Sequence, residues 1–330
     1  MKRNLKKIGI TLGDPAGIGP EIVLKALSGH PEIYENTLPV VFGSRAVLDA
    51  AMRNLGLQLE IKETTRLDEW PAGPQRIALF PATEPDTLPR PGKIDPLAGR
   101  LAFSWIEAAA AAANLKKIDA VVTAPINKGA LKQAGLPFRD HTEMFGRLSN
   151  SAAPMTLFVT GELRIFFYTR HIAFKDITAH LDKKTLVQTI NRCLSHLRRL
   201  GFGQPRLAVA ALNPHGGEGG LMGREEIDII EPAIGQAKVQ GAEVSGPIPA
   251  DSVFHLAKEG AYDAVLSLYH DQGHIAAKTL DFHRTVSLTM GLPFLRTSVD
   301  HGTAMDIAGK NVADETNMVQ AILAAAKYSW

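Results

Sequence analysis

The sequence has one cysteine, no long apolar run and almost no net charge. A single cysteine excludes a disulfide framework and a cysteine-ligated metal cluster, and we expect Cys193 to be a buried structural thiol on a helix. No apolar stretch reaches the roughly 18 residues that a membrane-spanning helix needs. A formal charge of +2 on 330 residues gives no reason to expect binding to nucleic acid or to a membrane.

The N-terminus MKRNLKKIGITLG is basic but lacks the apolar region and the cleavage site of a signal peptide. We therefore expect a cytoplasmic protein. A length of 330 residues with 45% hydrophobic and 21% charged residues is ordinary for an enzyme of about two domains.

Apolar segments of strand length alternate with helical segments along most of the chain. Strands are predicted at residues 7–12, 38–42, 77–80, 118–125, 206–212, 264–268, 286–289 and 294–297, and a hairpin at 154–169. Helices are predicted at 21–27, 97–114, 183–200, 225–240 and from about 315. This alternation favours parallel sheets with helices on both faces.

The segment Gly13–Pro20 joins the first strand to the first helix. Its glycines are spaced G-x-x-x-G-x-G, which differs from the G-x-G-x-x-G fingerprint of dinucleotide-binding loops. Two interpretations remain open: the segment shapes the rim of a binding site, or it only connects strand and helix.

Three histidines, His171, His215 and His270, each come just after an apolar strand, where the chain turns. Three neutral imidazoles leave a bound cation positive, and three protein ligands leave positions open for a substrate. The pattern therefore indicates a catalytic metal site, and a structural role for each histidine is the alternative.

Anion-binding side chains are also present near strand ends. Arg296 ends the short strand after Gly291, and Lys278 lies on the helix that begins near Asp271. A planar guanidinium and a point charge together suit a small substrate with two anionic groups. His141 and Thr142 open a helix and could add donors. The alternative is that Lys278 and Arg296 are solvent-exposed surface residues without a ligand.

Seven segments, in order over nearly the whole chain, resemble the 4-hydroxythreonine-4-phosphate dehydrogenase family of pyridoxine 5′-phosphate (vitamin B6) biosynthesis. They are GDPAGIGPE, TAPINKGAL, HTE, LNPHGGEGGLMGREE, PADSVF, YHDQGHIAAK and GLPFLRTSVDHGTAMDIAG. HGTAMDIAGK is also similar, more distantly, to isocitrate and isopropylmalate dehydrogenases. The resemblance implies two α/β/α domains with mostly parallel sheets, one formed by residues 1–125 and 285–330 and the other by 126–284.

The resemblance also assigns roles to individual residues. It implies a divalent metal (zinc, or cobalt or magnesium) bound by His171 and His215 of one subunit and His270 of the other, in a homodimer with shared sites. It implies substrate-binding roles for His141, Thr142, Lys278, Ser287 and Arg296, and catalytic roles for Asp251, Asp271 and Lys278. It places NAD or NADP along His301, Gly302, Thr303, Ala304 and Asp306.

The sequence departs from the family pattern at three places. Ser287 stands where many members have Asn, and Asp140 stands where Gly usually precedes His-Thr-Glu. The distant relatives end their cofactor motif in Ala-Asn-Pro, whereas this chain has Ala313-Asp314-Glu315. Serine lacks the fixed donor and acceptor of an amide, so the contact of residue 287 with the substrate would differ.

The function that the resemblance implies is NAD(P)-dependent oxidation of 4-phosphooxy-L-threonine at C3, followed by decarboxylation to 3-amino-2-oxopropyl phosphate. Paralogues that oxidise 4-phospho-D-threonate, 4-phospho-D-erythronate or a dihydrodiol carboxylate are the alternatives within the class. A non-catalytic protein that binds a phosphorylated ligand or a metal is the alternative from another class.

Overall fold

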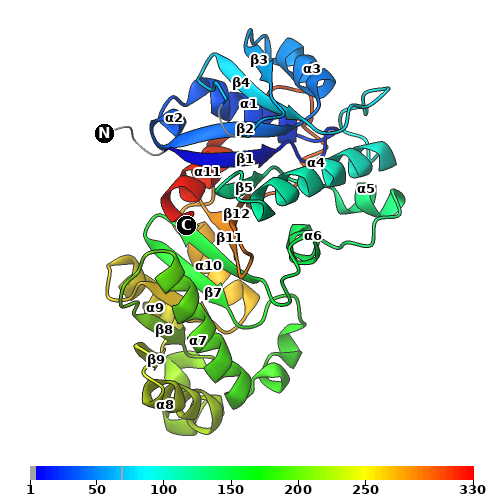
Figure 1. Ribbon diagram of the computed structural model, residues 1–330. Coiled ribbons are helices and arrows are strands. Elements are labelled where there is room, and N and C mark those ends of the chain that lie inside the picture. Colours follow the sequence, from blue (N-terminus) through cyan, green and yellow to red (C-terminus); the bar gives the residue numbers. More distant parts are fainter. Residues whose placement is uncertain (1–4, 68–69) are drawn as a thin grey trace. The chain divides into compact units, whose positions relative to one another are not determined.

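The structure is a computed structural model that describes residues 5–67 and 70–330, and the chain forms two compact units (Figure 1). Unit 1 comprises Met1–Pro154 and Val286–Trp330, and unit 2 comprises Met155–Thr285. The sequence placed the first boundary at 125/126. Residues 126–154 belong to unit 1 instead, because α5 (Lys128–Gln133) and α6 (His141–Leu148) pack on α4 (Pro96–Asn114).

The sheet of unit 1 has the strand order β3-β4-β2-β1-β5-β12-β11. Its neighbouring strands are parallel except for β12 and β11, which are antiparallel. The strands are β1 (Lys6–Thr11), β2 (Thr37–Gly43), β3 (Glu60–Glu63), β4 (Arg76–Pro81), β5 (Ala120–Thr123), β11 (Val286–Met290) and β12 (Leu295–Val299).

Helices cover both faces of this sheet. Arg296 and Thr297 are successive residues of β12, so their side chains point to opposite faces. Arg296 lies over the ring of Phe145 in α6, whereas the Thr297 hydroxyl donates to the carbonyl of Ala321 in α11. Besides α4, α5 and α6, the helices of unit 1 are α1 (Gly19–Gly29), α2 (Ile33–Asn36), α3 (Arg45–Leu55) and α11 (Thr316–Tyr328).

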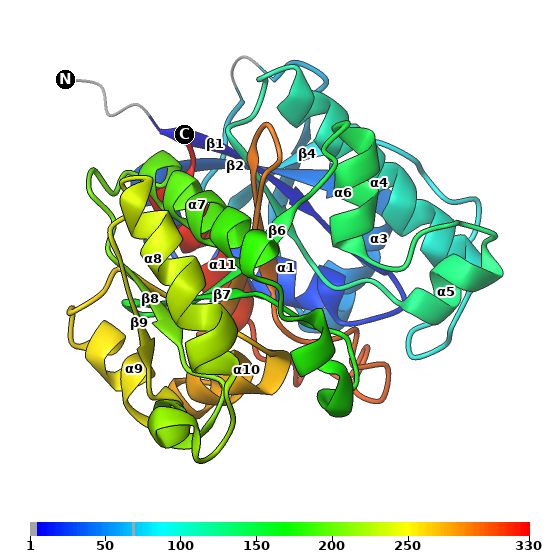
Figure 2. The same cartoon turned by 90° about the horizontal axis from the view of Figure 1, so that it is seen from below.

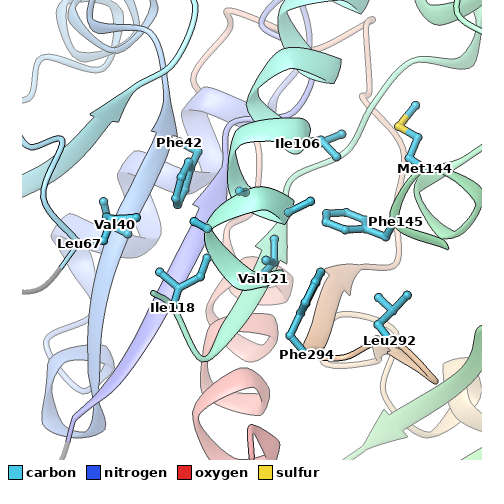
Figure 3. Packing of buried hydrophobic residues seen from close by; sticks show 14 of the residues in the cluster. Val40, Phe42, Leu67, Ile106, Ile118, Val121, Met144, Phe145, Leu292 and Phe294 are labelled. Atoms are coloured by element: carbon cyan, nitrogen blue, oxygen red, sulfur yellow. The ribbon is translucent and has the colours of Figure 1, made fainter. Parts of the chain in front are cut away.

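A hydrophobic cluster fills the space between the sheet and helices α4 and α6 (Figure 3). The alanine-rich centre of α4 contributes only small side chains there, so the helix lies close to the strands. The rings of Phe145 and Phe294 meet edge to face with centroids 6.0 Å apart. This packing anchors α6, whose first residue is His141, against the sheet.

The sheet of unit 2 has the strand order β6-β7-β10-β8-β9, with an antiparallel hairpin of β6 and β7 and parallel pairs beyond it. The strands are β6 (Met155–Thr160), β7 (Leu163–Phe167), β8 (Leu207–Ala210), β9 (Val244–Ile248) and β10 (Ala264–Ser267). The hairpin matches the prediction for residues 154–169.

The main helices of unit 2 pack on this sheet and on one another. They are α7 (Lys183–Arg199), α8 (Glu231–Val239), α9 (Ala250–Lys258) and α10 (His270–Leu280), and Figure 2 shows α7 and α8 side by side. Shorter turns are formed by Phe174–Asp176, Thr178–His180, Pro214–Gly220 and Glu226–Ile230. Asp182 caps α7 as predicted, by accepting from the backbone N–H of Thr185 at 2.8 Å.

The α/β architecture expected from the sequence, with mostly parallel sheets in both units, is confirmed. Cys193 is buried on α7, as predicted, and burial raises the pKa of its thiol. The sequence prediction missed β3 and β9, each of which is an edge strand in its unit. An edge strand is paired on one side only and tolerates charge and proline, so its apolar pattern is weak. No helix in the described ranges is long and apolar enough to cross a membrane.

Candidate active site

The three strand-end histidines all lie in unit 2, at one edge of its sheet. His171 follows β7, His215 follows β8, and His270 begins α10 directly after β10. Strands β7, β10 and β8 are adjacent and parallel, so their carboxyl ends meet at the same edge. Open α/β sheets bind ligands at this edge.

Two pockets at this edge contain the three histidines. His171 and His270 line one pocket, with their ring centroids 5.7 Å apart. His215 lines the other together with Asp251, and Tyr269 lines both. Within residues 5–67 and 70–330, no three His, Cys, Asp or Glu side chains are grouped as metal ligands. The resemblance assigned His270 to a second subunit, so a single chain was not expected to supply the whole set.

Two of these imidazoles have a carboxylate at Nδ1. His270 Nδ1 lies 2.6 Å from Asp271 Oδ1, and His215 Nδ1 lies 3.0 Å from Glu218 Oε1. A carboxylate at Nδ1 favours the tautomer that leaves the Nε2 lone pair available to a cation, as in many histidine-ligated metal sites. The donor set therefore fits a divalent metal that prefers imidazole ligands, such as zinc or cobalt.

The turn that carries His215 is held by a buried carboxylate. His215 and Glu218 have positive φ angles of 51° and 42°, which are unusual for residues with a side chain. Glu226 is 1% exposed, and its Oε1 accepts from the backbone N–H groups of Leu212 and Asn213, each at 2.8 Å. Sequence reasoning did not single out Glu226, although it lies in the GREE segment that directly follows the glycine-rich turn.

Unit 1 contains a separate cluster around Arg296 of β12. The side chain is 4% exposed, and burial lowers the pKa of its guanidinium to about 9. Nε and Nη2 donate to Thr123 Oγ1 at 3.1 and 2.6 Å, and Nη1 donates to Thr289 Oγ1 at 3.0 Å. A guanidinium has five N–H groups, so one remains on each terminal nitrogen. This pair suits two oxygens of a carboxylate or a phosphate.

His141 belongs to the same cluster. Its ring stacks on Phe145 with centroids 6.5 Å apart, and the guanidinium carbon of Arg296 lies 5.8 Å from the Phe145 centroid. Burial and the charge of Arg296 hold the pKa of His141 well below its usual value, so the imidazole is neutral. His141 Nε2 is buried and has no hydrogen-bond partner within the described part of the chain. The structure thus brings together two of the predicted substrate-binding residues.

The other predicted substrate-binding and catalytic residues are spread over both units. In unit 1, Thr142 follows His141 on α6, and Ser287 of β11 pairs with Ser298 of β12. In unit 2, Lys278 lies on α10 with its Nζ 5.0 Å from the centroid of Phe282. The carboxylates of Asp251 and Asp271 are exposed at the histidine edge of unit 2.

The stretch from His301 to Asp306, where the cofactor was expected, packs against the loop between β1 and α1. The Thr303 carbonyl accepts from the N–H of Ile18 at 3.0 Å, and a Cβ on Gly17 would lie 2.8 Å from the Thr303 Cβ. His301 Nε2 is buried without a partner in the described residues. The Gly13–Pro20 loop therefore supports the stretch where the cofactor was expected. The unpaired His301 Nε2 is compatible with a bound polar group.

Asp14 of this loop is fully buried. Its Oδ1 accepts from the N–H of Ala16 at 2.8 Å, whereas its Oδ2 has no partner among the described residues. Burial raises the pKa of Asp14 from 3.8 to about 6, with a smaller contribution from Asp95. The folded state therefore favours the protonated carboxyl. This stabilisation is complete below pH 3.8 and is lost as the pH rises through 6.

The neutral variant Asp14→Asn removes this pH dependence. Relative to wild type, we expect its free energy of unfolding to increase by about 2 kcal/mol between pH 4 and pH 8. Urea unfolding of both proteins at the two pH values measures the difference, and any fixed effect of the amide cancels between them. If the free energies of unfolding of the two proteins differed by the same amount at both pH values, the raised pKa of the buried Asp14 carboxyl would be contradicted.

Whole-chain relatives place this protein in the class of α/β dehydrogenases. A curated protein of Symbiobacterium thermophilum named "Putative D-threonate 4-phosphate dehydrogenase" is 48% identical over 324 residues, which cover 98% of this chain and 96% of that protein. The chain belongs to the family described as pyridoxal phosphate biosynthetic protein PdxA, whose model matches residues 35–325. The resemblance inferred from the motifs is confirmed.

Of two further relatives, one has the same name and the other has a different name. A protein of Halalkalibacterium halodurans with the same name as the Symbiobacterium relative is 47% identical over 331 residues, covering 98% of this chain and 96% of that protein. A solved structure of 4-hydroxythreonine-4-phosphate dehydrogenase from Klebsiella pneumoniae is 39% identical, with a TM-score of 0.87, and covers 97% of this chain and 98% of that one. The relatives agree on the dehydrogenase class and differ in the substrate that they name.

Proposed function

We propose that this protein is an NAD(P)-dependent dehydrogenase that oxidises the C3 hydroxyl of a phosphorylated four-carbon acid, with D-threonate 4-phosphate as its preferred substrate. The observation that carries the proposal is the buried guanidinium of Arg296, which keeps one N–H on each terminal nitrogen beside the neutral His141. The names of the 48% and 47% identical relatives support the choice of substrate.

The expected substrate, 4-phosphooxy-L-threonine, is the second candidate. It is supported by the name of the solved structure, which is 39% identical to this chain. Threonate carries a hydroxyl at C2 where the amino acid carries an ammonium group. Ser287 supplies a short hydroxyl in place of the asparagine that many family members have, so the chain differs from them at a substrate-binding position.

Arg296 and Lys278 would bind the two anionic groups of the substrate. The planar fork of Arg296 suits two oxygens of one group, and Lys278 acts as a point charge for the other. His141 Nε2 and the Thr142 hydroxyl would complete the polar contacts. Because His141 is neutral, it orients the substrate without adding charge.

His171, His215 and His270 would hold the divalent metal, and the His301–Asp306 stretch would bind the dinucleotide. A bound cation supplies Lewis acidity to hydroxyl and carbonyl oxygens, and a bound nicotinamide accepts hydride. Asp271 Oδ1, 2.6 Å from His270 Nδ1, fixes the orientation of that imidazole. Asp251 and Asp271 are two carboxylates of this edge and would accept the hydroxyl proton.

The overall bond changes follow from the substrate. The C3–H bond breaks as hydride, and the C3 hydroxyl loses its proton, which gives a 3-oxo acid. The bond from C2 to the carboxyl carbon then breaks, carbon dioxide leaves, and C2 takes up a proton. D-Threonate 4-phosphate would thus give dihydroxyacetone phosphate, whereas 4-phosphooxy-L-threonine would give 3-amino-2-oxopropyl phosphate.

We also propose that the protein is a homodimer formed through the α9 and α10 side of unit 2. Phe174, Ile275 and Leu280 are 76%, 64% and 40% exposed, and all three line one pocket together with Asp251 and Tyr269. Large apolar side chains gathered on one surface are typical of a protein interface. A second copy seated there would bring its own strand-end histidines towards this edge, as the resemblance implies.

A direct comparison of substrates tests the proposed function. The purified protein, loaded with zinc or cobalt, is assayed for reduction of NAD and NADP with D-threonate 4-phosphate, D-erythronate 4-phosphate and 4-phosphooxy-L-threonine. We expect the threonate to give the highest kcat/KM. A higher value for the amino acid would transfer the assignment to the second candidate, and no reduction with any of them would contradict the proposal.

A further inference from the structure

The threonine pair (Thr123 and Thr289) lies on the strands on either side of Arg296. In the antiparallel pair of β11 and β12, Thr289 stands directly opposite Arg296. In the parallel pair of β5 and β12, Arg296 is in register with Val121, so Thr123 is two residues further along and faces the same side. The register of three strands thus places a hydroxyl on each flank of one arginine.

The Thr123 hydroxyl both accepts and donates hydrogen bonds. Its Oγ1 accepts from both Nε and Nη2 of Arg296, and its own hydrogen is directed to Ser298 Oγ at 3.1 Å. A hydroxyl has one donor and two acceptor positions, so this arrangement uses all of them. Both hydroxyls are buried, with Thr123 at 0% and Thr289 at 1% exposure.

No carboxylate lies within ion-pair distance of Arg296 in the part of the chain that the structure describes. Asp140 acts on the guanidinium only as a more distant charge. A long side chain with rotatable bonds needs fixed partners to hold one orientation, and here the polar partners are hydroxyls. The ring of Phe145 lies beside the guanidinium and limits its movement on that side.

We propose that Thr123 and Thr289 are positioning residues that orient the Arg296 guanidinium so that its remaining N–H pair meets an anionic group of the substrate. This inference rests on the proposed function in that Arg296 binds the substrate. A hydroxyl is suited to the task because it orients the cation without neutralising it, whereas a carboxylate would compete with the substrate anion.

Removal of either hydroxyl tests the proposal. Thr123→Val and Thr289→Val keep the β-branched shape and remove the acceptor, so Arg296 stays in place with fewer constraints. We expect KM for the phosphorylated acid to rise about tenfold in each variant, with a smaller change in kcat. The affinity for inorganic phosphate, measured by calorimetry without substrate or cofactor, should fall by a similar factor.

Two further variants separate positioning from simple loss of a buried hydroxyl. Thr297→Val removes a buried hydroxyl from the residue next to Arg296, but that hydroxyl donates to the Ala321 carbonyl on the opposite face. We expect its KM and phosphate affinity to match wild type. Thr123→Ser retains the acceptor and should rescue most of the loss seen in Thr123→Val.

The outcomes distinguish this inference from the proposed function. Weaker phosphate binding in the two threonine variants, with no turnover of any phosphorylated acid by wild type, would retain the positioning role and reject the proposed activity. Unchanged KM and unchanged phosphate affinity in folded Thr123→Val and Thr289→Val would overturn the inference. A wild-type protein that binds neither inorganic phosphate nor a simple carboxylate such as acetate would also overturn it, because the remaining N–H pair would then not be an anion site.

Discussion

Replacement of His215 by alanine is expected to lower kcat/KM for D-threonate 4-phosphate by about 10³-fold and to reduce the bound metal. The imidazole is one of three proposed ligands, and its loss would remove the cation that polarises the reacting oxygen. Steady-state kinetics and metal analysis of the purified variant measure the two effects separately. His215→Asn provides a second variant, because asparagine adopts the positive φ of 51° at this position more readily than alanine does.

His283→Ala is the matched control for this prediction. His283 is exposed and lies in unit 2 close in sequence to α10, but it does not follow a strand end of that sheet. We expect its kcat/KM and its metal content to stay near wild type. Full activity in folded His215→Ala protein without bound metal would contradict the metal assignment.

The proposed sharing of each metal site between two subunits allows a further test of the metal ligands. His215→Ala and His270→Ala homodimers should each be inactive. In a mixed dimer, one site would combine both substitutions and the other would have neither, if His215 and His270 of a site come from different subunits. Subunit exchange between the two inactive proteins should therefore restore activity. No restoration, with exchange verified, would place both ligands on one chain.

Arg296→Met is expected to raise KM for the phosphorylated acid at least 100-fold without lowering stability. The variant loses two hydrogen bonds from a charged group to an anion, worth about 1.5–3 kcal/mol each. The guanidinium is buried and bonded to hydroxyls only, so it gains little from ion pairing and costs desolvation energy in the folded state. The desolvation energy that is saved offsets the loss of a donor at the Thr123 and Thr289 hydroxyls, so we expect little net change in stability.

Kinetics and thermal unfolding of Arg296→Met test both parts of this expectation. Arg147→Met is the matched control, because Arg147 is an exposed arginine on α6 whose salt bridge with Glu143 is worth about 0–1 kcal/mol. Its KM should stay within about twofold of wild type. An unchanged KM in Arg296→Met would show that Arg296 does not bind the anionic substrate, and this would contradict the proposed function.

The sequence predicted the parts of the site that depend on local pattern. His171, His215 and His270 were recognisable because each follows an apolar strand, and in the structure all three lie at one sheet edge. The alternation of strands and helices likewise predicted the α/β architecture. Arg296 could be selected as a candidate, but nothing in its neighbourhood in the sequence indicated that it is buried.

The parts that depend on strand register could not be predicted. Thr123 and Arg296 are 173 residues apart, and only the pairing of β5 with β12 brings them into contact. The boundary at residue 125 differed for a related reason, because α6 joins unit 1 through the packing of Phe145 against Phe294, which is distant in sequence. Local patterns predict which elements form, whereas side-chain partners between distant strands require the assembled sheet.

The most direct test of the central claim compares D-threonate 4-phosphate with unphosphorylated D-threonate in the reduction of NAD and NADP by the metal-loaded protein. We predict that reduced nicotinamide accumulates with the phosphorylated acid and that kcat/KM for D-threonate is at least 100-fold lower, because Arg296 or Lys278 would then lack an anionic partner. Equal rates with both acids, or reduction only with a cyclic dihydrodiol carboxylate, would contradict a dehydrogenase specific for phosphorylated four-carbon acids. No reduction with any of these compounds would favour a non-catalytic binding protein.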